Sequence, residues 1–168
     1  MGYHTDFEGE FNLNIPLTEE HKTYLSKFNI SRRFKRHADK CAIFPDPIRE
    51  AANLPIGEDA CNFVGDNSFM GQMGQSNDGS VVDYNQPPSS QPGLWCQWTP
   101  NQDGTAIEWD CGEKFYHYIE WIEYLIVNFL TPWGYTLNGQ VSWRGEDFTD
   151  VGTIMVTDNV VTTKMWAI

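Results

Sequence analysis

Cysteine and histidine are scarce in this chain of 168 residues, and neither type forms a metal-binding pattern. The four cysteines include no Cys-x-x-Cys pair, and the four histidines include no His-Glu-x-x-His spacing. Four scattered cysteines are also too few for a disulfide scaffold. We therefore expect no metal site and no cofactor.

Long hydrophobic runs are also missing. The longest uninterrupted apolar run lies around Leu125–Val127, whereas a membrane-spanning helix needs roughly 20 apolar residues. The first residues, Met-Gly-Tyr-His-Thr-Asp, show no basic segment followed by an apolar one. These absences predict a cytoplasmic protein that does not enter a membrane.

Basic residues are few, with 11 Lys and Arg against 23 Asp and Glu and a net charge of −12. Such a balance disfavours direct binding to nucleic acid through phosphate contacts. The phosphate-loop, dinucleotide-binding, Gly-x-Ser-x-Gly and kinase motifs are all absent. An enzyme would need residues that only the fold brings together, so we leave catalysis uncertain and lean against it.

What the sequence does contain is a set of clear secondary-structure patterns. Apolar and polar residues alternate over residues 5–15, which predicts a half-buried strand. Thr18 followed by Glu19 and Glu20 predicts the start of a short helix that ends near Phe28. Asp103-Gly104 predicts a hairpin turn with Trp98 opposite Trp109.

The strongest pattern covers Glu113–Leu130, where apolar residues recur at helical spacing and predict an amphipathic helix of about five turns. Three strand-like segments follow, at residues 136–143, 152–157 and 160–166. Together these elements predict an α+β fold, in which one long and one short helix pack on one face of an antiparallel sheet of five or six strands. We expect a single domain over residues 1–168, with an irregular inserted loop at about residues 41–92 that is rich in Pro and Gly.

One cationic run, Ser31–Lys40, holds five of the eleven basic residues. A run of this kind can bind a phosphate-bearing ligand or an acidic partner. The alternative is a solvated helix end whose cations complement the helix dipole. Aromatic residues make up 14% of the chain, and two of them complete the ligand site that we predict. Its residues are Arg32, Arg33, Lys35, Arg36, Phe69 and Trp95.

A second candidate site combines Asp110, Glu113 and His117. On the predicted helix, Glu113 and His117 lie one turn apart, and a carboxylate beside an imidazole can support acid–base chemistry. An exposed Glu–His pair at this spacing is also an ordinary surface contact. These three residues are the basis of an alternative function as a hydrolase or transferase.

Several segments resemble a family of small uncharacterised proteins from bacteria and their tailed phages. The resemblance lies in Gly2–Phe7, in Tyr24–Arg33, in Gln91–Trp98 (Gln-Pro-Gly-Leu-Trp-Cys-Gln-Trp), in Glu108–Tyr116 (Glu-Trp-Asp-Cys-Gly-Glu-Lys-Phe-Tyr) and in Leu137–Asp147, continued by Val156–Val160. The family has no established activity and brings no site residues with it. The resemblance implies an accessory protein in the host cytoplasm, encoded by a bacterium or a phage, that acts on a host factor in counter-defence.

Three functional hypotheses follow from these observations. The leading one is a non-enzymatic protein that binds a host protein or sequesters a small phosphorylated, nucleotide-like ligand. The second is the hydrolase or transferase at Asp110, Glu113 and His117. The third is an acidic mimic of nucleic acid that binds a basic host protein. A homo-oligomer is compatible with all three.

Overall fold

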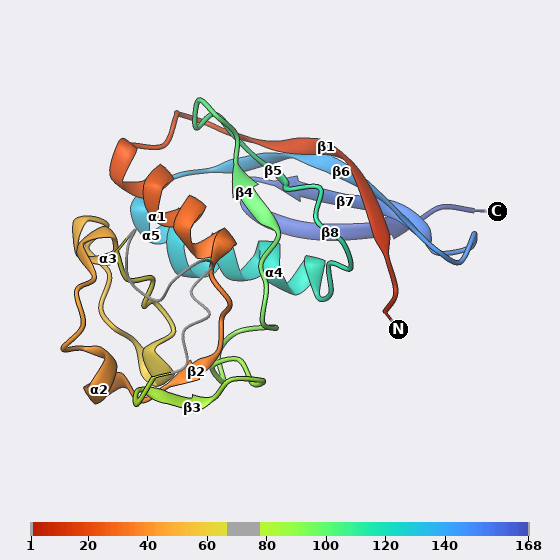
Figure 1. Cartoon of the computed structure of the whole chain (residues 1–168). Helices are drawn as coiled ribbons and strands as arrows, with labels where there is room; N and C mark the ends of the chain where they lie inside the picture. The colour runs from red at the N-terminus through yellow and green to blue at the C-terminus, as the bar shows by residue number, and fades with distance from the viewer. Residues whose placement is uncertain (1, 67–77, 168) are drawn as a thin grey trace. The chain divides into compact units, whose positions relative to one another are not determined.

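The computed structural model describes residues 2–66 and 78–167. The chain divides into two compact units (Figure 1). The first unit consists of Met1–Leu17 and Gln97–Ile168, and the second consists of Thr18–Cys96. The single domain over residues 1–168 therefore stays a prediction.

The first unit contains a six-stranded antiparallel sheet in the order β4-β5-β1-β6-β7-β8 (Figure 1). Together with the helices, this sheet confirms the predicted α+β class and the predicted strand number. The predicted strands are all present, with ends that shift by a few residues. Their bounds are β1 Thr5–Leu13, β4 Trp98–Pro100, β5 Ala106–Trp109, β6 Leu137–Gly145, β7 Val151–Thr157 and β8 Val160–Met165.

The hairpin between β4 and β5 has the predicted register, with Trp98 directly opposite Trp109. Its turn is longer than the two residues predicted, because the Asn101 side-chain oxygen accepts the N–H groups of Thr105 and Ala106 at 2.9 and 3.1 Å. Gly104 takes a positive φ of 74° in this turn. Pro100 is accommodated because β4 is an edge strand.

The predicted long helix begins later than the sequence pattern indicates. Helix α4 covers Tyr118–Leu125, continues through the π-helical turn η3 (Ile126–Leu130), and ends with α5 (Thr131–Trp133) before Gly134. Lys114 and His117 have positive φ values of 57° and 59°, so the segment from Glu113 to His117 is not helical. The prediction of a helix that starts at Glu113 is therefore wrong.

Helix α4 packs on one face of the sheet, where the aromatic residues of the first unit gather. The indole N–H of Trp98 donates to the Tyr118 carbonyl at 2.8 Å, and the Tyr118 ring lies 6.0 Å from that of Trp143. Phe7 makes edge-on contacts with Trp98 at 5.4 Å and with Phe115 at 5.7 Å. These edge-on and tilted ring contacts form part of the core of the unit, together with buried aliphatic side chains.

The second unit is built around helix α1 (Glu19–Ile30), as predicted from Thr18 and the two glutamates. The Thr18 hydroxyl accepts the His21 N–H at 3.3 Å, and Tyr24, Leu25 and Phe28 are buried. The rest of the unit contains short elements and irregular chain. These elements are β2 Lys35–Arg36, α2 Ala38–Cys41, α3 Pro47–Ala51, η1 Glu58–Ala60 and β3 Val81–Asp83, with β2 paired to β3.

A small core holds these short elements together. Phe34, Cys41, Ala60 and Phe63 are buried in it, and half-buried apolar side chains pack around them. Regular backbone hydrogen-bond ladders are short in this unit. Side chains therefore form hydrogen bonds with backbone N–H and C=O groups that would otherwise lack a partner. Two of these bonds come from the basic run, from Arg32 to the Tyr84 carbonyl and from Arg33 to the Cys61 carbonyl.

Candidate functional site

Arg36, one of the predicted ligand-binding residues, is buried in β2 and paired inside the second unit. Its Nη1 lies 3.1 Å from Asp78 Oδ2, and its guanidinium lies 4.4 Å from the centre of the Phe34 ring. Burial raises the pKa of Asp78, but hydrogen bonds from Ser80 and the charge of Arg36 lower it by more, so the net pKa is below the usual value. Arg36 thus joins β2 to the chain that enters β3.

Arg32 and Lys35 are half-buried and also make internal contacts. Arg32 donates to the Tyr84 carbonyl at 3.1 Å and to Asn85 Oδ1 at 3.2 Å, and its guanidinium stacks on the Tyr84 ring. Lys35 Nζ lies 4.0 Å from Asp59 Oδ2. A backbone hydrogen bond from Ser89, more than the charge of Lys35, keeps the pKa of Asp59 below its usual value.

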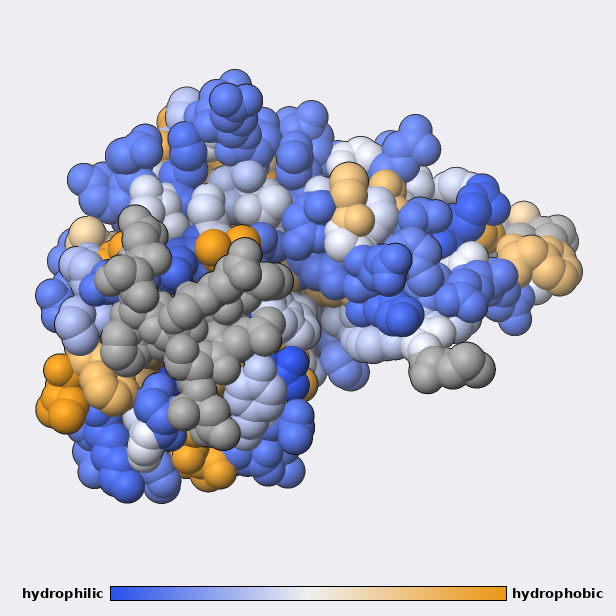
Figure 2. All heavy atoms as spheres, in the orientation of Figure 1, coloured by the Kyte–Doolittle hydropathy of each residue, from blue (hydrophilic) through white to orange (hydrophobic). Residues whose placement is uncertain are grey.

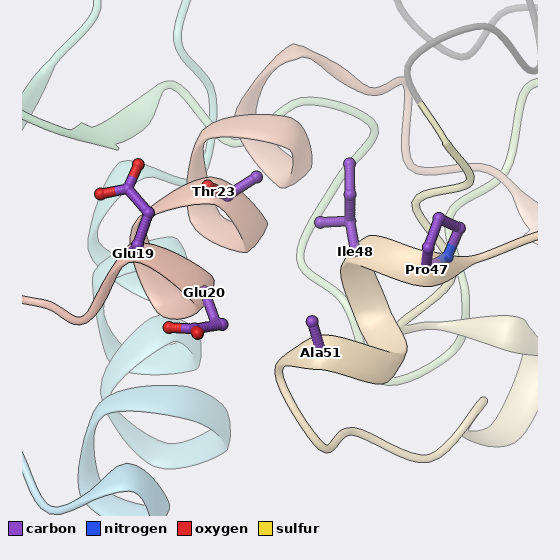
Figure 3. A pocket seen from close by; sticks show the side chains of 6 residues that line it. All are labelled: Glu19, Glu20, Thr23, Pro47, Ile48 and Ala51. Atoms are coloured by element: carbon purple, nitrogen blue, oxygen red, sulfur yellow. The ribbon is translucent and has the colours of Figure 1, made fainter.

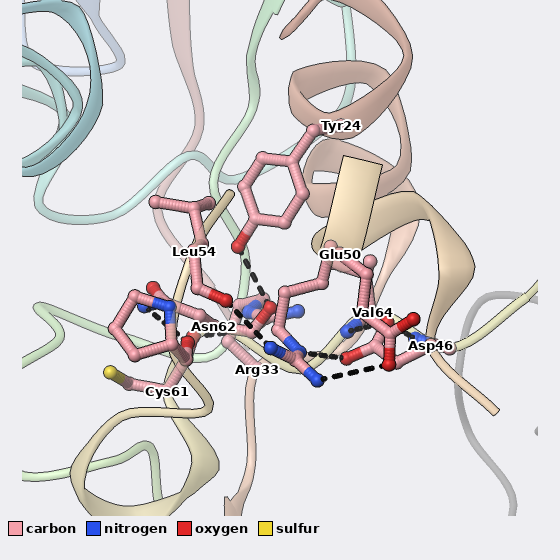
Figure 4. A network of polar contacts seen from close by, with 11 residues as sticks. Tyr24, Arg33, Asp46, Glu50, Leu54, Cys61, Asn62 and Val64 are labelled. Carbon is pink, nitrogen blue, oxygen red and sulfur yellow. Dashed lines mark hydrogen bonds and ion pairs between the residues drawn. The ribbon is translucent and has the colours of Figure 1, made fainter. Parts of the chain in front are cut away.

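Arg33 is buried, and its Nη2 donates to the Cys61 carbonyl at 2.6 Å (Figure 4). The three arginines line one small cavity, which Trp95 does not line. Trp95 is half-buried, and Phe69 lies outside the described residues. The structure therefore brings Arg32, Arg33 and Arg36 together around an interior space.

The alternative catalytic residues are not joined into one constellation. Asp110 accepts the Gly112 N–H at 2.7 Å, whereas Glu113 contributes its backbone carbonyl to a bond from Gln97. His117 Nδ1 lies 3.7 Å from Glu120 Oε2 rather than beside Glu113, and both of those side chains are more than half exposed. The predicted Glu113–His117 contact on one helix face is wrong, because the helix starts at Tyr118.

A cluster that sequence reasoning missed surrounds Tyr3 and Asp150 in the first unit. The Tyr3 hydroxyl donates to Asp150 Oδ2 at 2.8 Å and accepts the Asp147 N–H at 3.0 Å. The Trp143 indole donates to the other Asp150 oxygen at 3.0 Å. No local signal predicts this cluster, because the pairing of Thr5 with Gly145 is what brings the two segments together.

His4 belongs to the same region and has both ring nitrogens engaged. Its Nδ1 accepts the Lys114 N–H at 3.1 Å, so the proton resides on Nε2, which lies 2.9 Å from Asp6 Oδ1. With both nitrogens occupied by the chain itself, this imidazole holds the N-terminal segment in place.

Most acidic side chains are exposed, whereas most basic side chains are buried or half-buried. Sixteen of the 23 acidic residues are exposed, against four of the eleven basic ones, namely Lys40, Lys114, Arg144 and Lys164. No charged side chain falls within residues 1, 67–77 and 168, so these counts cover the whole chain. On the face drawn in Figure 2, hydrophilic residues cover most of the described surface.

A pocket lies in the second unit, between α1 and α3 (Figure 3). It has a volume of about 250 Å³, and its wall on α3 is formed by Pro47, Ile48 and Ala51. Glu19 and Glu20, together with Thr23, form the wall on the first turns of α1. The lining of the pocket is thus mainly apolar, and the exposed Glu19 and Glu20 carboxylates point away from α3 (Figure 3).

Within residues 2–66 and 78–167, no group of three or more His, Cys, Asp or Glu side chains is placed to hold a metal ion. No helix in the same part of the chain is long and apolar enough to cross a membrane.

Comparison of the chain with protein-family models, with curated proteins and with solved structures finds no significant match. The resemblance to small proteins of bacteria and tailed phages therefore stays a prediction.

Proposed function

We propose that the protein is a non-enzymatic binding protein of the cytoplasm that engages a basic partner protein through its carboxylates. The observation that carries this proposal is the sorting of charge, because sixteen acidic side chains are exposed against four basic ones. A surface of this kind attracts cationic partners and repels nucleic acid and anionic ligands. If the chain is an accessory protein of a phage or bacterium, the partner is a host protein.

The pocket between α1 and α3 is the anchoring point that we propose for this partner. Its volume of about 250 Å³ lies below the roughly 300 Å³ at which pockets for drug-sized ligands begin, so it suits one side chain better than a nucleotide. An arginine or lysine combines a long apolar stem with a charged end. In this proposal the stem lies against Ile48 and Ala51, and the Glu19 and Glu20 carboxylates, which point away from α3 in Figure 3, turn to meet the cation.

The proposed anchoring pocket makes the hypothesis of an acidic mimic of nucleic acid more specific. A polyanionic decoy needs only a high density of carboxylates, whereas an anchoring pocket gives the interaction one position on the chain. Interface energy is concentrated in side chains that fill such pockets, and arginine is enriched among them. We therefore expect binding to depend on this pocket more than on net charge.

The test uses an arginine-containing peptide and its citrulline counterpart, with binding measured by calorimetry. We expect the arginine peptide to bind, the citrulline peptide to bind much more weakly, and salt to weaken the charged interaction. Glu19→Gln with Glu20→Gln removes the two carboxylates, and Ala51→Arg fills the pocket. Both changes should abolish binding, and circular dichroism checks that α1 still forms.

The matched control is Glu8→Gln with Glu10→Gln, which also removes two exposed carboxylates but on β1 of the first unit. This control should retain binding. Equal losses in the two double variants would show that net charge alone drives the interaction. Equal binding of the arginine and citrulline peptides would reject the proposed recognition of a cation.

A further inference from the structure

Strand β8 forms a long, exposed edge of the six-stranded sheet (Figure 1). The opposite edge, β4, has only three residues, and Pro100 in it has no N–H to offer another strand. Strand β8 has six residues, of which five are exposed, and it contains neither proline nor glycine. Four of the six are β-branched, which suits strand pairing. An edge of this kind is a template for a further strand.

Alternate residues of β8 have backbone groups that point away from the sheet. Just past the end of β8, the Trp166 N–H donates to the Val151 carbonyl on β7 at 3.0 Å. Hydrogen-bonded and non-hydrogen-bonded residues alternate along an antiparallel strand, so every second residue before Trp166 also bonds to β7. The residues between them direct their N–H and C=O groups outward, where no hydrogen bond within the described chain satisfies them. These residues are Val161, Thr163 and Met165.

The charge at this edge differs from that of the rest of the chain. The whole chain has a net charge of −12, but residues 159–168 include no Asp or Glu and one basic residue, Lys164. Apolar side chains are exposed here instead, with Val160 at 62%, Met165 at 57% and Trp166 at 40% exposure. Without carboxylates, this edge does not attract a basic protein. It is, however, a place where two copies of the acidic chain can meet without bringing carboxylate side chains together.

The backbone of β8 is complementary to that of a second β8 in one antiparallel register. When Thr163 lies opposite Thr163 of the second copy, Val161 lies opposite the other copy's Met165, and the converse holds by symmetry. All the outward backbone groups then face one another as hydrogen-bonded pairs, each of which exchanges both N–H···O bonds. This register therefore satisfies every free backbone group of the edge.

The side chains favour the same register. Val160 then lies opposite Trp166 of the second copy, so two exposed apolar side chains cover each other, and Lys164 lies opposite Thr162. A slip in one direction would place Lys164 against its own copy, and like charges directly opposite each other are unfavourable. A slip in the other direction would leave Met165 and Trp166 beyond the paired strands.

We propose that β8 pairs with β8 of a second copy in this register, so that two sheets join across a two-fold axis at Thr163. Such an interface uses the same surface on both copies and closes as a dimer. The dimer edge lies in the first unit, whereas the pocket proposed for a basic partner lies in the second. Neither proposal depends on the other.

The experiment is sedimentation equilibrium of the full chain over a range of concentrations, in which we expect a monomer–dimer equilibrium. Thr163→Lys brings two cations together at the two-fold axis and should raise the dimer dissociation constant at least about tenfold. Asn12→Lys is the matched control, because it adds the same charge at an exposed residue of an interior strand, β1. This control should dimerise like the wild type.

Disulfide crosslinking tests the register and covers the case in which Thr163→Lys fails to fold. All chains carry Cys111→Ser, which removes the exposed native cysteine. A mixture of Thr162→Cys chains and Lys164→Cys chains should form a crosslinked heterodimer, because these positions form a non-hydrogen-bonded pair with Cα atoms about 4.5 Å apart. Lys164→Cys alone should crosslink far less, because the two cysteines are not directly opposite.

Several outcomes would overturn the proposal. A wild-type chain that stays monomeric up to about 1 mM would show that the edge does not pair. A dimer that persists unchanged in Thr163→Lys, or that weakens equally in Asn12→Lys, would show that copies do not meet at this edge. Crosslinking of Lys164→Cys to itself as efficiently as to Thr162→Cys would reject the register.

Discussion

Gly152 on β7 lies directly opposite Trp143 on β6, and a Cβ atom at position 152 would overlap the Trp143 indole ring. The same atom would stand 2.6 Å from the Lys164 carbonyl oxygen on β8. The indole in turn donates to Asp150, which binds the Tyr3 hydroxyl. A glycine at this position therefore permits the bonds that hold the N-terminal segment.

Gly152→Ala should destabilise the protein by about 1–3 kcal/mol, because overpacking forces the Trp143 ring from its position. Urea unfolding followed by tryptophan fluorescence measures this change. Gly79→Ala is the control, since a Cβ atom there meets nothing within 4 Å. We expect it to alter stability by less than about 0.5 kcal/mol, and a similar loss in both variants would contradict the steric argument.

Asp46 and Arg49 form an ion pair inside the second unit, and the Asp46 carboxylate also accepts the Gly65 N–H at 2.8 Å (Figure 4). Asp46→Ala should cost about 3–5 kcal/mol, because it removes the close carboxylate partner of a largely buried guanidinium. Glu50→Gln is the control. It removes a largely exposed carboxylate that lies 3.9 Å from Arg49, and exposed pairs contribute about 0–1 kcal/mol.

The contribution of Asp46 to the stability of the protein also depends on pH. Burial raises the pKa of Asp46, and the bonds from Arg49 and the backbone reduce that rise without cancelling it. The folded state therefore binds this proton more tightly than the unfolded state, and the contribution of Asp46 to stability declines as pH rises through its native pKa. In Arg49→Met, we expect part of the lost stability to return as pH falls from neutral towards 4. Urea unfolding across this range tests it.

Asp78 should show the opposite dependence, because its pKa in the folded state is lowered. Its contribution is present above the usual carboxyl pKa of 3.8 and is lost as pH falls through the native value. Asp78→Asn should cost about 1–3 kcal/mol near neutral pH, because its hydrogen bonds with Arg36 and Ser80 weaken. As pH falls below 4, the Asp78→Asn variant should lose less of its remaining stability than the wild type does. Asp39→Asn, at an exposed residue, should follow the wild-type curve.

The cysteines should differ sharply in reactivity. Burial raises the pKa of the Cys41 thiol to about 12, so almost none of it is thiolate near neutral pH. Cys96 is also buried, whereas Cys111 is exposed. In a thiol-reagent assay on the folded protein, we expect Cys111 to react fast and Cys41 only on unfolding. Cys111→Ser should remove the fast phase, and a fast reaction that remains would show that another thiol is accessible.

The parts of the fold that could be predicted are those that depend on residues close together in the sequence. Alternation over β1, the cap at Thr18 and the Asp103-Gly104 turn each depend on neighbouring residues, and each predicted element is present. The predicted start of the long helix was wrong because a contact between distant segments determines it. The Lys114 N–H bonds to His4, 110 residues away, and this holds Glu113–His117 out of the helix while Phe115 stays buried.

The sequence by itself determined the composition of charge, the strands, the two main helices and the absence of familiar catalytic motifs. Only the tertiary structure decided where the charges lie. Arg32, Arg33 and Arg36 form one cationic run in the chain, yet their partners are 28 to 53 residues away, and the fold turns these side chains inward. Distant segments supply the carbonyls and carboxylates that make burial of a guanidinium possible. The exposed charge of the chain is therefore mainly acidic, and most of the cations of the predicted basic site are buried or half-buried.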